Sequence, residues 1–217
     1  MSERTSDAAG LAERLRLGDA DALADLFSRH RQRLSQIVDF RLDRRLLGRV
    51  DPDDILQEAY VDAAERIDYF VNDHSGSVFV WLRLILAQTL ANVHRRHLGA
   101  QMRDVSREFS IFGHRGTQDA STSLALQLLG HFTSPSQAAI QEETSQKLAQ
   151  AIEQLGPLDR EVLTLRHFEQ LTNSEVAEVL GIQKKAASIR YIRALKRLKQ
   201  VLEDTPGFTA GSSGSVL

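Results

Sequence analysis

Apolar residues recur along this chain at intervals of three and four positions, the spacing that places side chains on one face of an α-helix. No stretch alternates valine or isoleucine with polar residues, and Gly and Pro are sparse. The pattern therefore predicts an all-α protein. We expect helices over residues 11–47, 51–67, 77–98, 139–155, 158–168, 173–180 and 184–202.

The clearest helix start in the first half is the segment Asp51-Pro52-Asp53-Asp54. Asp51 suits the N-cap, Pro52 suits the first helical position, and acids in the first turn complement the helix dipole. A polar loop is predicted over residues 72–76. The long helix after it carries Trp81 in its apolar stripe, which favours a core position over base stacking.

A change in composition predicts two small helical domains joined by a flexible linker. Residues 110–136 are rich in Ser, Thr, Gly and Gln, apart from an apolar patch at residues 124–129 that suits one short helix. We expect domains over residues 11–104 and 137–203, with the linker over residues 105–136. Residues 1–10 and 204–217 are expected to be disordered.

The C-terminal domain contains a predicted helix-turn-helix. Thr172 and Glu175 form a capping box at its first helix, and Gly181 suits the turn that follows. Seven Lys or Arg and no acid lie between Ile182 and Gln200. The buried stripe of this basic helix is expected to comprise Ile189, Ile192, Leu195 and Leu198. A helix of this kind is typical of the major groove, and the alternative is a solvated basic surface.

Charge is segregated locally, although the formal net charge of the chain is only −2. Seven acids and one Arg lie between Asp51 and Asp68, a local charge of −6, and the following helix ends in residues 94–97, His-Arg-Arg-His. An acidic helix beside a basic helix end indicates two partners, a cationic protein surface and a nucleic acid. His94 and His97 are expected to be weak additional donors near phosphate.

Several classes of function are excluded. The chain has no Cys, and its seven His residues are scattered, so we expect no metal site and no cofactor. It has no nucleophile–base pair and no Gly-rich phosphate loop, so we do not expect an enzyme. The longest apolar stretch, residues 78–93, is interrupted by polar residues, and residues 1–10 contain no apolar run of the kind expected in a signal peptide. We therefore expect a cytoplasmic protein without membrane insertion.

Residues 51–60, DPDDILQEAY, resemble the D-x-x-D-[LI]-x-Q-E-x-[FY] signature of the sigma-70 family of bacterial RNA polymerase sigma factors. Residues 79–82, with Asn92, Arg95 and Arg96, are similar to the adjoining promoter-melting segment. Residues 155–163 and the helix-turn-helix resemble the promoter-reading domain. With two domains and a short linker, the chain resembles the extracytoplasmic-function class.

The resemblance implies roles for particular residues and names partners. The residues implied to dock on the β′ clamp helices of core RNA polymerase are Asp54, Leu56, Gln57 and Glu58. Contacts with the −10 promoter element fall to Asn72, Asn92, Arg95 and Arg96, with the loop of residues 72–77 holding a flipped base. The resemblance implies that the −35 element is contacted by Lys184, Lys185, Ser188, Arg190 and Arg193. The resemblance also implies contact with the polymerase β flap and with double- and single-stranded promoter DNA. An anti-sigma factor is usual in the family, and nothing in the sequence identifies one.

Two other functions remain open. The chain could be a stand-alone helix-turn-helix regulator with an N-terminal sensing or dimerisation domain, or a protein-interaction module whose basic helix binds an acidic partner. A stand-alone regulator has no reason to carry the acidic signature of residues 54–58. The chain also departs from the family, because Ala87-Gln88 stands where Arg-Asn is frequent, Asn92 where Asp is common and Ala187 where Val is usual.

Overall fold

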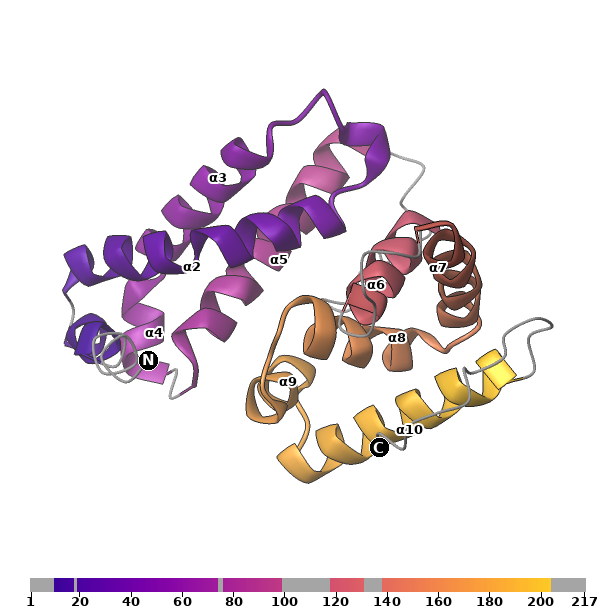
Figure 1. The fold of residues 1–217 in the computed structure, drawn as a ribbon. Helices are drawn as coiled ribbons and strands as arrows, with labels where there is room; N and C mark the ends of the chain where they lie inside the picture. The colour runs from indigo at the N-terminus through magenta and orange to yellow at the C-terminus, as the bar shows by residue number, and fades with distance from the viewer. Residues whose placement is uncertain (1–9, 18, 74–75, 99–117, 131–137, 204–217) are drawn as a thin grey trace. The chain divides into compact units, whose positions relative to one another are not determined.

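The computed structural model describes residues 10–17, 19–73, 76–98, 118–130 and 138–203. Within these ranges the chain forms helices and no β-strand, which confirms the all-α prediction (Figure 1). The chain divides into two compact units, Met1–Ile111 and Phe112–Leu217. The segments predicted to be disordered, residues 1–10 and 204–217, lie outside the described residues apart from Gly10, as does much of the predicted linker.

The first unit is built around three helices that pack against one another. After a short helix over residues 10–16 come α2 (Ala20–Arg41), a 3-10 turn (Arg44–Leu46), α3 (Pro52–Glu65), α4 (Ile67–Asp73) and α5 (Val78–Leu98). Helices α2, α3 and α5 lie side by side (Figure 1). Their apolar stripes meet in a core whose fully buried side chains include Leu23, Leu34, Ile55, Leu82 and Leu86.

The predicted start of α3 is confirmed. The Asp51 carboxylate accepts a hydrogen bond from the Asp53 amide at 2.9 Å, and Pro52 occupies the first helical turn. The helix ends two residues earlier than expected, because the Arg66 amide bonds to the Ala63 carbonyl and a separate helix, α4, begins at Ile67. The acidic segment is therefore divided between two helices.

Helix α4 bears on two predictions, the position of Asn72 and the role of Trp81. Asn72 lies within this helix and donates to the Asp68 carbonyl at 2.7 Å, so it does not belong to the predicted loop. Phe70 is fully buried and its ring lies 4.6 Å from that of Trp81, which is 4% exposed. Trp81 is therefore a core residue, as the sequence favoured.

The second unit contains α6 (Gln118–Gly130), α7 (Ala138–Glu153), α8 (Pro157–Leu163), a π-helical turn (Thr164–Phe168), α9 (Asn173–Leu180) and α10 (Lys184–Glu203). Helix α6 packs against α7, and α10 packs against α7, α8 and α9. Leu124, Ala125 and Leu128 of α6 belong to the same core as Leu198 of α10. The apolar patch that the sequence placed in a linker is thus part of this unit's core.

The helix-turn-helix has the predicted local chemistry. The Glu175 amide donates to the Thr172 hydroxyl at 3.2 Å, and the Thr172 amide donates to the Glu175 carboxylate at 2.8 Å. Gly181 ends α9 with a φ of 62°, a left-handed conformation that a residue with a Cβ adopts only with strain. The capping box and the Gly181 amide, which donates to the Ala177 and Glu178 carbonyls, satisfy some of the free backbone groups at both ends of a helix of only eight residues.

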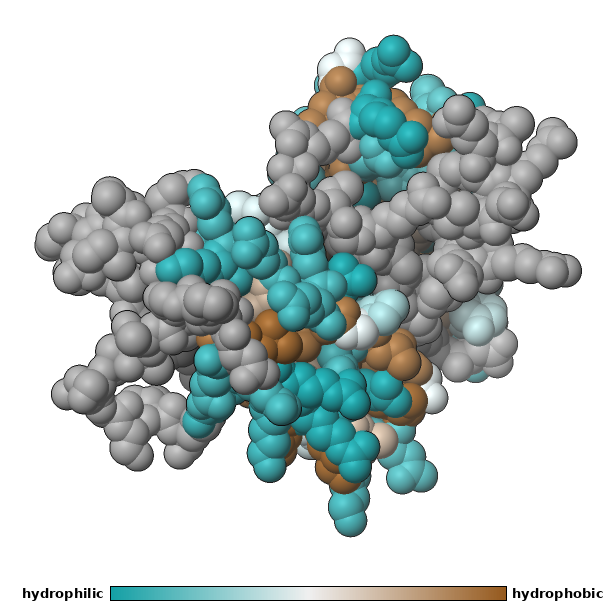
Figure 2. Space-filling model, turned by 90° about the vertical axis from the view of Figure 1, so that its right-hand side faces the viewer, coloured by the Kyte–Doolittle hydropathy of each residue, from teal (hydrophilic) through white to brown (hydrophobic). Residues whose placement is uncertain are grey.

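The surface is mixed in character. The face of the molecule in Figure 2 shows hydrophilic side chains with small apolar areas among the described residues. In the second unit the large apolar side chains that are exposed include Leu126, Leu158, Ile189 and Ile192. None of the helices in the described ranges combines the length and the apolar character needed to cross a membrane.

Candidate functional site

The basic helix α10 presents some of the predicted −35 residues more openly than others. Lys184, Lys185 and Arg193 are exposed. Ser188 and Arg190 are half-buried, and the Ser188 hydroxyl accepts a hydrogen bond from the Asn173 side-chain amide at 3.1 Å. That bond joins the two helices of the motif, so Ser188 has a structural contact of its own.

The buried face of α10 differs from the predicted stripe. Ile189 is 42% exposed and Ile192 is 51% exposed, whereas Ala187, Ala194 and Leu198 are buried. Successive residues turn by about 100° around a helix, which places these two isoleucines opposite the buried set. The predicted stripe was wrong at Ile189 and Ile192, because the prediction gave the buried positions to large apolar residues. The structure instead uses two alanines, whose small side chains allow close helix packing.

Not every cation of α10 is available to a ligand. Arg197 forms an ion pair with Asp159 of α8, and the Asp159 side chain is only 8% exposed. Lys199 lies 3.8 Å from Glu203. Arg197 therefore helps to hold α10 on α8, and the exposed cations that remain towards the start of the helix are Lys184, Lys185, Arg193 and Lys196.

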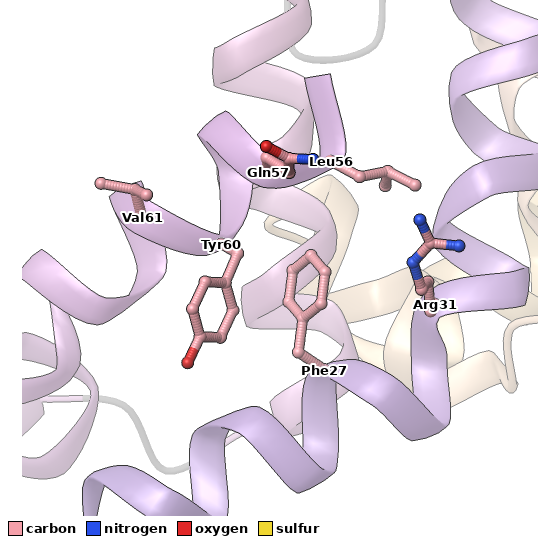
Figure 3. A pocket seen from close by; sticks show the side chains of 6 residues that line it. All are labelled: Phe27, Arg31, Leu56, Gln57, Tyr60 and Val61. Atoms are coloured by element: carbon pink, nitrogen blue, oxygen red, sulfur yellow. The ribbon is translucent and has the colours of Figure 1, made fainter. Parts of the chain in front are cut away.

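The acidic signature presents its polar residues to solvent and buries its leucine. Asp54 and Gln57 are exposed, whereas Leu56 is 1% exposed and packs in the core. Leu56 and Gln57 line a pocket of about 300 Å³ between α2 and α3 (Figure 3). The Phe27 and Tyr60 rings meet edge to face in its wall, with centroids 5.2 Å apart.

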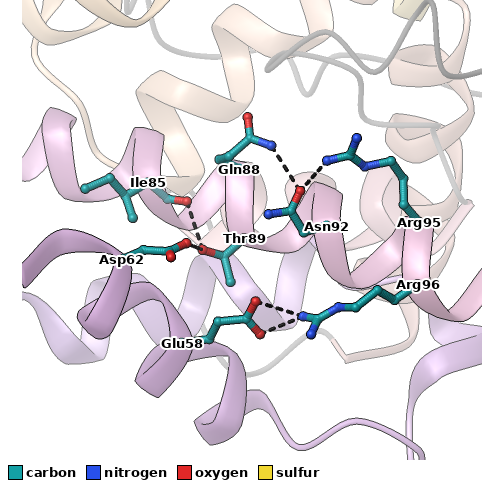
Figure 4. A network of polar contacts seen from close by, with 8 residues as sticks. All are labelled: Glu58, Asp62, Ile85, Gln88, Thr89, Asn92, Arg95 and Arg96. Atoms are coloured by element: carbon teal, nitrogen blue, oxygen red, sulfur yellow. Dashed lines mark hydrogen bonds and ion pairs between the residues drawn. The ribbon is translucent and has the colours of Figure 1, made fainter. Parts of the chain in front are cut away.

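The structure brings a predicted polymerase-docking residue together with a predicted DNA-binding residue. Arg96 of α5 donates through one nitrogen to both carboxylate oxygens of Glu58, at 2.8 and 2.6 Å (Figure 4). Both side chains are partly exposed. The two residues lie 38 positions apart in the chain, so the motifs alone gave no signal for this contact.

Three of the four predicted −10 residues share one surface. Asn92, Arg95 and Arg96 line an open pocket of about 510 Å³ together with Glu58. The Asn92 side-chain oxygen accepts from Arg95 and, at 3.2 Å, from Gln88 (Figure 4). Asn72 is not among the residues that line this pocket. Asn72 belongs to α4. Asn92 belongs to α5 and lies about 21 Å from the first residue of α5, measured along the axis of α5.

His94 is buried in the first unit. It is 7% exposed, and its Nε2 accepts a hydrogen bond from the Asp43 amide at 3.2 Å. Burial lowers the pKa of His94 below its ordinary value of 6.5. Arg45 donates to the Asp43 carboxylate at 2.7 Å and lowers the pKa of Asp43 to about 2. The prediction that His94 is a donor to phosphate was therefore wrong, because its Nε2 is unprotonated and accepts a hydrogen bond from the backbone of the first unit.

In the described ranges no group of three or more His, Asp or Glu side chains is arranged to hold a metal ion. The three surfaces differ in charge, with an acidic one on α3 and two basic ones, at the end of α5 and the start of α10. Such surfaces suit a cationic protein and an anionic polymer, respectively.

Comparison with known proteins gives matches to the same family over both units. The family model described as sigma-70, region 4, matches residues 145–198. The chain is 25% identical to the ECF RNA polymerase sigma factor SigW of Bacillus subtilis, over 88% of this chain and 95% of SigW. It is 26% identical to the ECF RNA polymerase sigma-E factor of Escherichia coli K12, over 89% of this chain and 93% of that protein.

Among solved structures, the chain is similar to CnrH, whose structure is that of a complex with the cytosolic domain of CnrY. The similarity has a TM-score of 0.50 and 22% sequence identity, over 89% of this chain and 96% of the CnrH chain. At this level of identity the likeness concerns the fold.

Proposed function

We infer that this chain, which belongs to the extracytoplasmic-function class of the sigma-70 family, binds core RNA polymerase and directs it to promoters in transcription initiation. The observation that carries this function is the presence in one chain of an acidic signature helix, α3, and a basic helix-turn-helix, α9–α10. A stand-alone DNA-binding regulator uses the second feature but has no use for the first.

The first unit supplies the polymerase contact in this proposal. Asp54 and Gln57 are exposed on α3, where they reach basic residues of the β′ clamp helices. Leu56 is buried, so it acts by shaping the pocket beside Gln57 and not by direct polar contact. Glu58 differs from Asp54 because its carboxylate already binds Arg96. Asp54 is therefore the sharper probe of docking.

The end of α5 supplies the −10 contact. Asn92, Arg95 and Arg96 present hydrogen-bond donors and positive charge on one surface, which suits phosphates and base edges. Asn72, which lies in α4 and not in the predicted loop, and the residues that follow it to Ser77 would hold a base flipped out of the duplex, and this step would aid promoter melting. Flipping is least costly where pairing is already weak.

The second unit supplies the −35 contact and the contact with the β flap. Lys184 and Lys185 stand at the exposed start of α10, the part of a recognition helix that reaches base edges. Arg193 lies further along and suits a phosphate. Ser188 and Arg190 lie on the same helix and are half-buried, so they are less open to DNA than Lys184 and Lys185.

We propose a binding role without catalysis, in the cytoplasm where the polymerase acts. The net charge of −2 gives free DNA little general attraction to the chain. When polymerase holds both units near one promoter, the effective concentration of each rises, and two weak contacts become one strong contact. An anti-sigma factor, usual in this class, would act by covering one of these surfaces.

Co-purification with core polymerase tests the docking assignment. Asp54→Lys reverses an exposed charge inside the signature, and Glu65→Lys makes the same change on the same helix outside it. Loss of binding is expected for Asp54→Lys alone. Equal binding by both variants and the natural chain would remove α3 from the polymerase interface.

A further inference from the structure

The outward face of α10 carries two isoleucines among cations. Ile189 is 42% exposed and Ile192 is 51% exposed. Residues four apart on a helix share a face, which places Lys185 and Arg193 beside Ile189, and Lys196 beside Ile192. All three cations are exposed. The face therefore combines apolar side chains with positive charge.

The fold does not need these isoleucines. The side of α10 that packs into the second unit is formed by Ala187, Ala194 and Leu198, and the two isoleucines point away from it. Exposed apolar side chains are common singly, but two of them one turn apart between cations form a patch. A partner that covers the patch must offer negative charge and apolar groups within a few ångströms of each other.

The major groove of DNA offers that combination. Its rims carry phosphates, which attract Lys and Arg. The one apolar group that a base pair presents on its floor is the C5-methyl group of thymine, and apolar side chains read it by contact. An apolar helix of another protein would cover the isoleucines but would leave the surrounding cations without partners. Charge complementarity therefore favours DNA over a protein surface.

We propose that Ile189 and Ile192 contact thymine methyl groups in the −35 element and so make A·T pairs at those positions a determinant of promoter choice. This inference rests on the proposed −35 function of α10. It adds a class of contact that the basic residues cannot provide, because Lys and Arg hydrogen bonds do not sense a methyl group. The structure thus assigns part of the base specificity to residues that the sequence placed in the core.

A selection followed by uracil substitution tests the inference. Polymerase reconstituted with the full chain is used to select duplexes from a library randomised across the −35 region. Each selected thymine is then replaced by uracil, which lacks only the methyl group. Where an isoleucine contacts that methyl, binding should weaken about three- to fivefold, the equivalent of one buried methyl group.

Alanine variants connect each methyl group to its residue. Ile189→Ala and Ile192→Ala are each expected to lose sensitivity to uracil at one position and to relax the selection for thymine there. Leu126→Ala is the matched control, because Leu126 is 47% exposed on α6 of the same unit. It should keep the sensitivity of the natural chain.

The possible outcomes separate this inference from the function on which it rests. An enriched −35 sequence that is indifferent to uracil, or equally sensitive in all variants, overturns the methyl contact. Loss of polymerase binding in the isoleucine variants, with no uracil effect, assigns the patch to a protein partner instead. If the natural chain enriches no sequence although it binds polymerase, the −35 function itself fails, and the inference fails with it.

Discussion

The four signature residues of α3, Asp54, Leu56, Gln57 and Glu58, lie in three different environments. In the fold, Asp54 and Gln57 are exposed, Leu56 is buried and Glu58 is bound to Arg96. The exposure of these four residues thus differs along one helix, because it depends on how α3 packs against α2 and α5.

The Glu58–Arg96 pair is expected to contribute little to stability. Both side chains are partly exposed, and ion pairs of this kind contribute at most about 1 kcal/mol. Glu58→Gln should therefore lower the free energy of unfolding of the first unit by less than about 1 kcal/mol. Urea unfolding followed by the emission of Trp81, the only tryptophan, measures it. A much larger loss would show that the pair is part of the core structure.

His94 should make the first unit sensitive to acid. Its folded-state pKa lies below 6.5, so between that pKa and 6.5 the unfolded chain binds more protons than the folded one. The free energy of unfolding should therefore fall as the pH falls below 6.5, when protonation removes the acceptor for the Asp43 amide. Asp43, with a pKa of about 2, should add a further loss only at much lower pH.

The histidine contribution is measured by comparing variants across pH. Denaturant unfolding of His94→Gln should show a weaker dependence on pH near 6.5 than the natural chain. His97→Gln, a change at an exposed position on the same helix, is the control and should leave the dependence intact. An unchanged slope in His94→Gln would contradict the assignment.

At the scale of elements, the predictions that held rest on local chemistry. The N-cap at Asp51, the capping box of Thr172 and Glu175, and the left-handed Gly181 each involve residues within a few positions of one another. Such contacts are visible in sequence because neighbouring residues form them whatever the rest of the fold does.

The predictions that failed depend on contacts between distant segments. Ile189 and Ile192 match a buried stripe in hydropathy, yet Ala187 and Ala194 take the inner face because α10 packs closely on its neighbours. The burial of His94, whose Nε2 accepts a hydrogen bond from the Asp43 amide, likewise depends on contacts between distant segments of the first unit. The break after Glu65 is different, because it is a local contact between the Arg66 amide and the Ala63 carbonyl. Helical periodicity fixes which residues share a face, and tertiary packing decides which face is inside.

The capping box should contribute measurably to the stability of the second unit. Thr172→Ala removes the hydroxyl that accepts from the Glu175 amide, and loss of an N-cap costs about 1 kcal/mol. Ser174→Ala, at an exposed position in the first turn of the same helix, is the control. Thermal unfolding followed by circular dichroism should separate the two variants, and equal stability would show that the cap is not needed.

At the scale of the whole molecule, the arrangement predicts weak binding to free DNA. The exposed cations of α10 act against an overall charge of −2, so the chain alone should bind promoter and random duplexes weakly. Fluorescence anisotropy should show affinity that falls steeply with salt, because counterions are released from phosphates. Tight, sequence-specific binding by the free chain would favour a stand-alone regulator instead.

Run-off transcription is the direct test of whether this chain directs core polymerase to promoters. The purified chain is added to core polymerase on a library of genomic promoter fragments, with Asp54→Lys and Glu65→Lys assayed beside it. We expect discrete start sites that require the chain, that disappear with Asp54→Lys and that persist with Glu65→Lys. The absence of any start site that depends on the chain, from a core polymerase active with another sigma factor, would contradict this expectation.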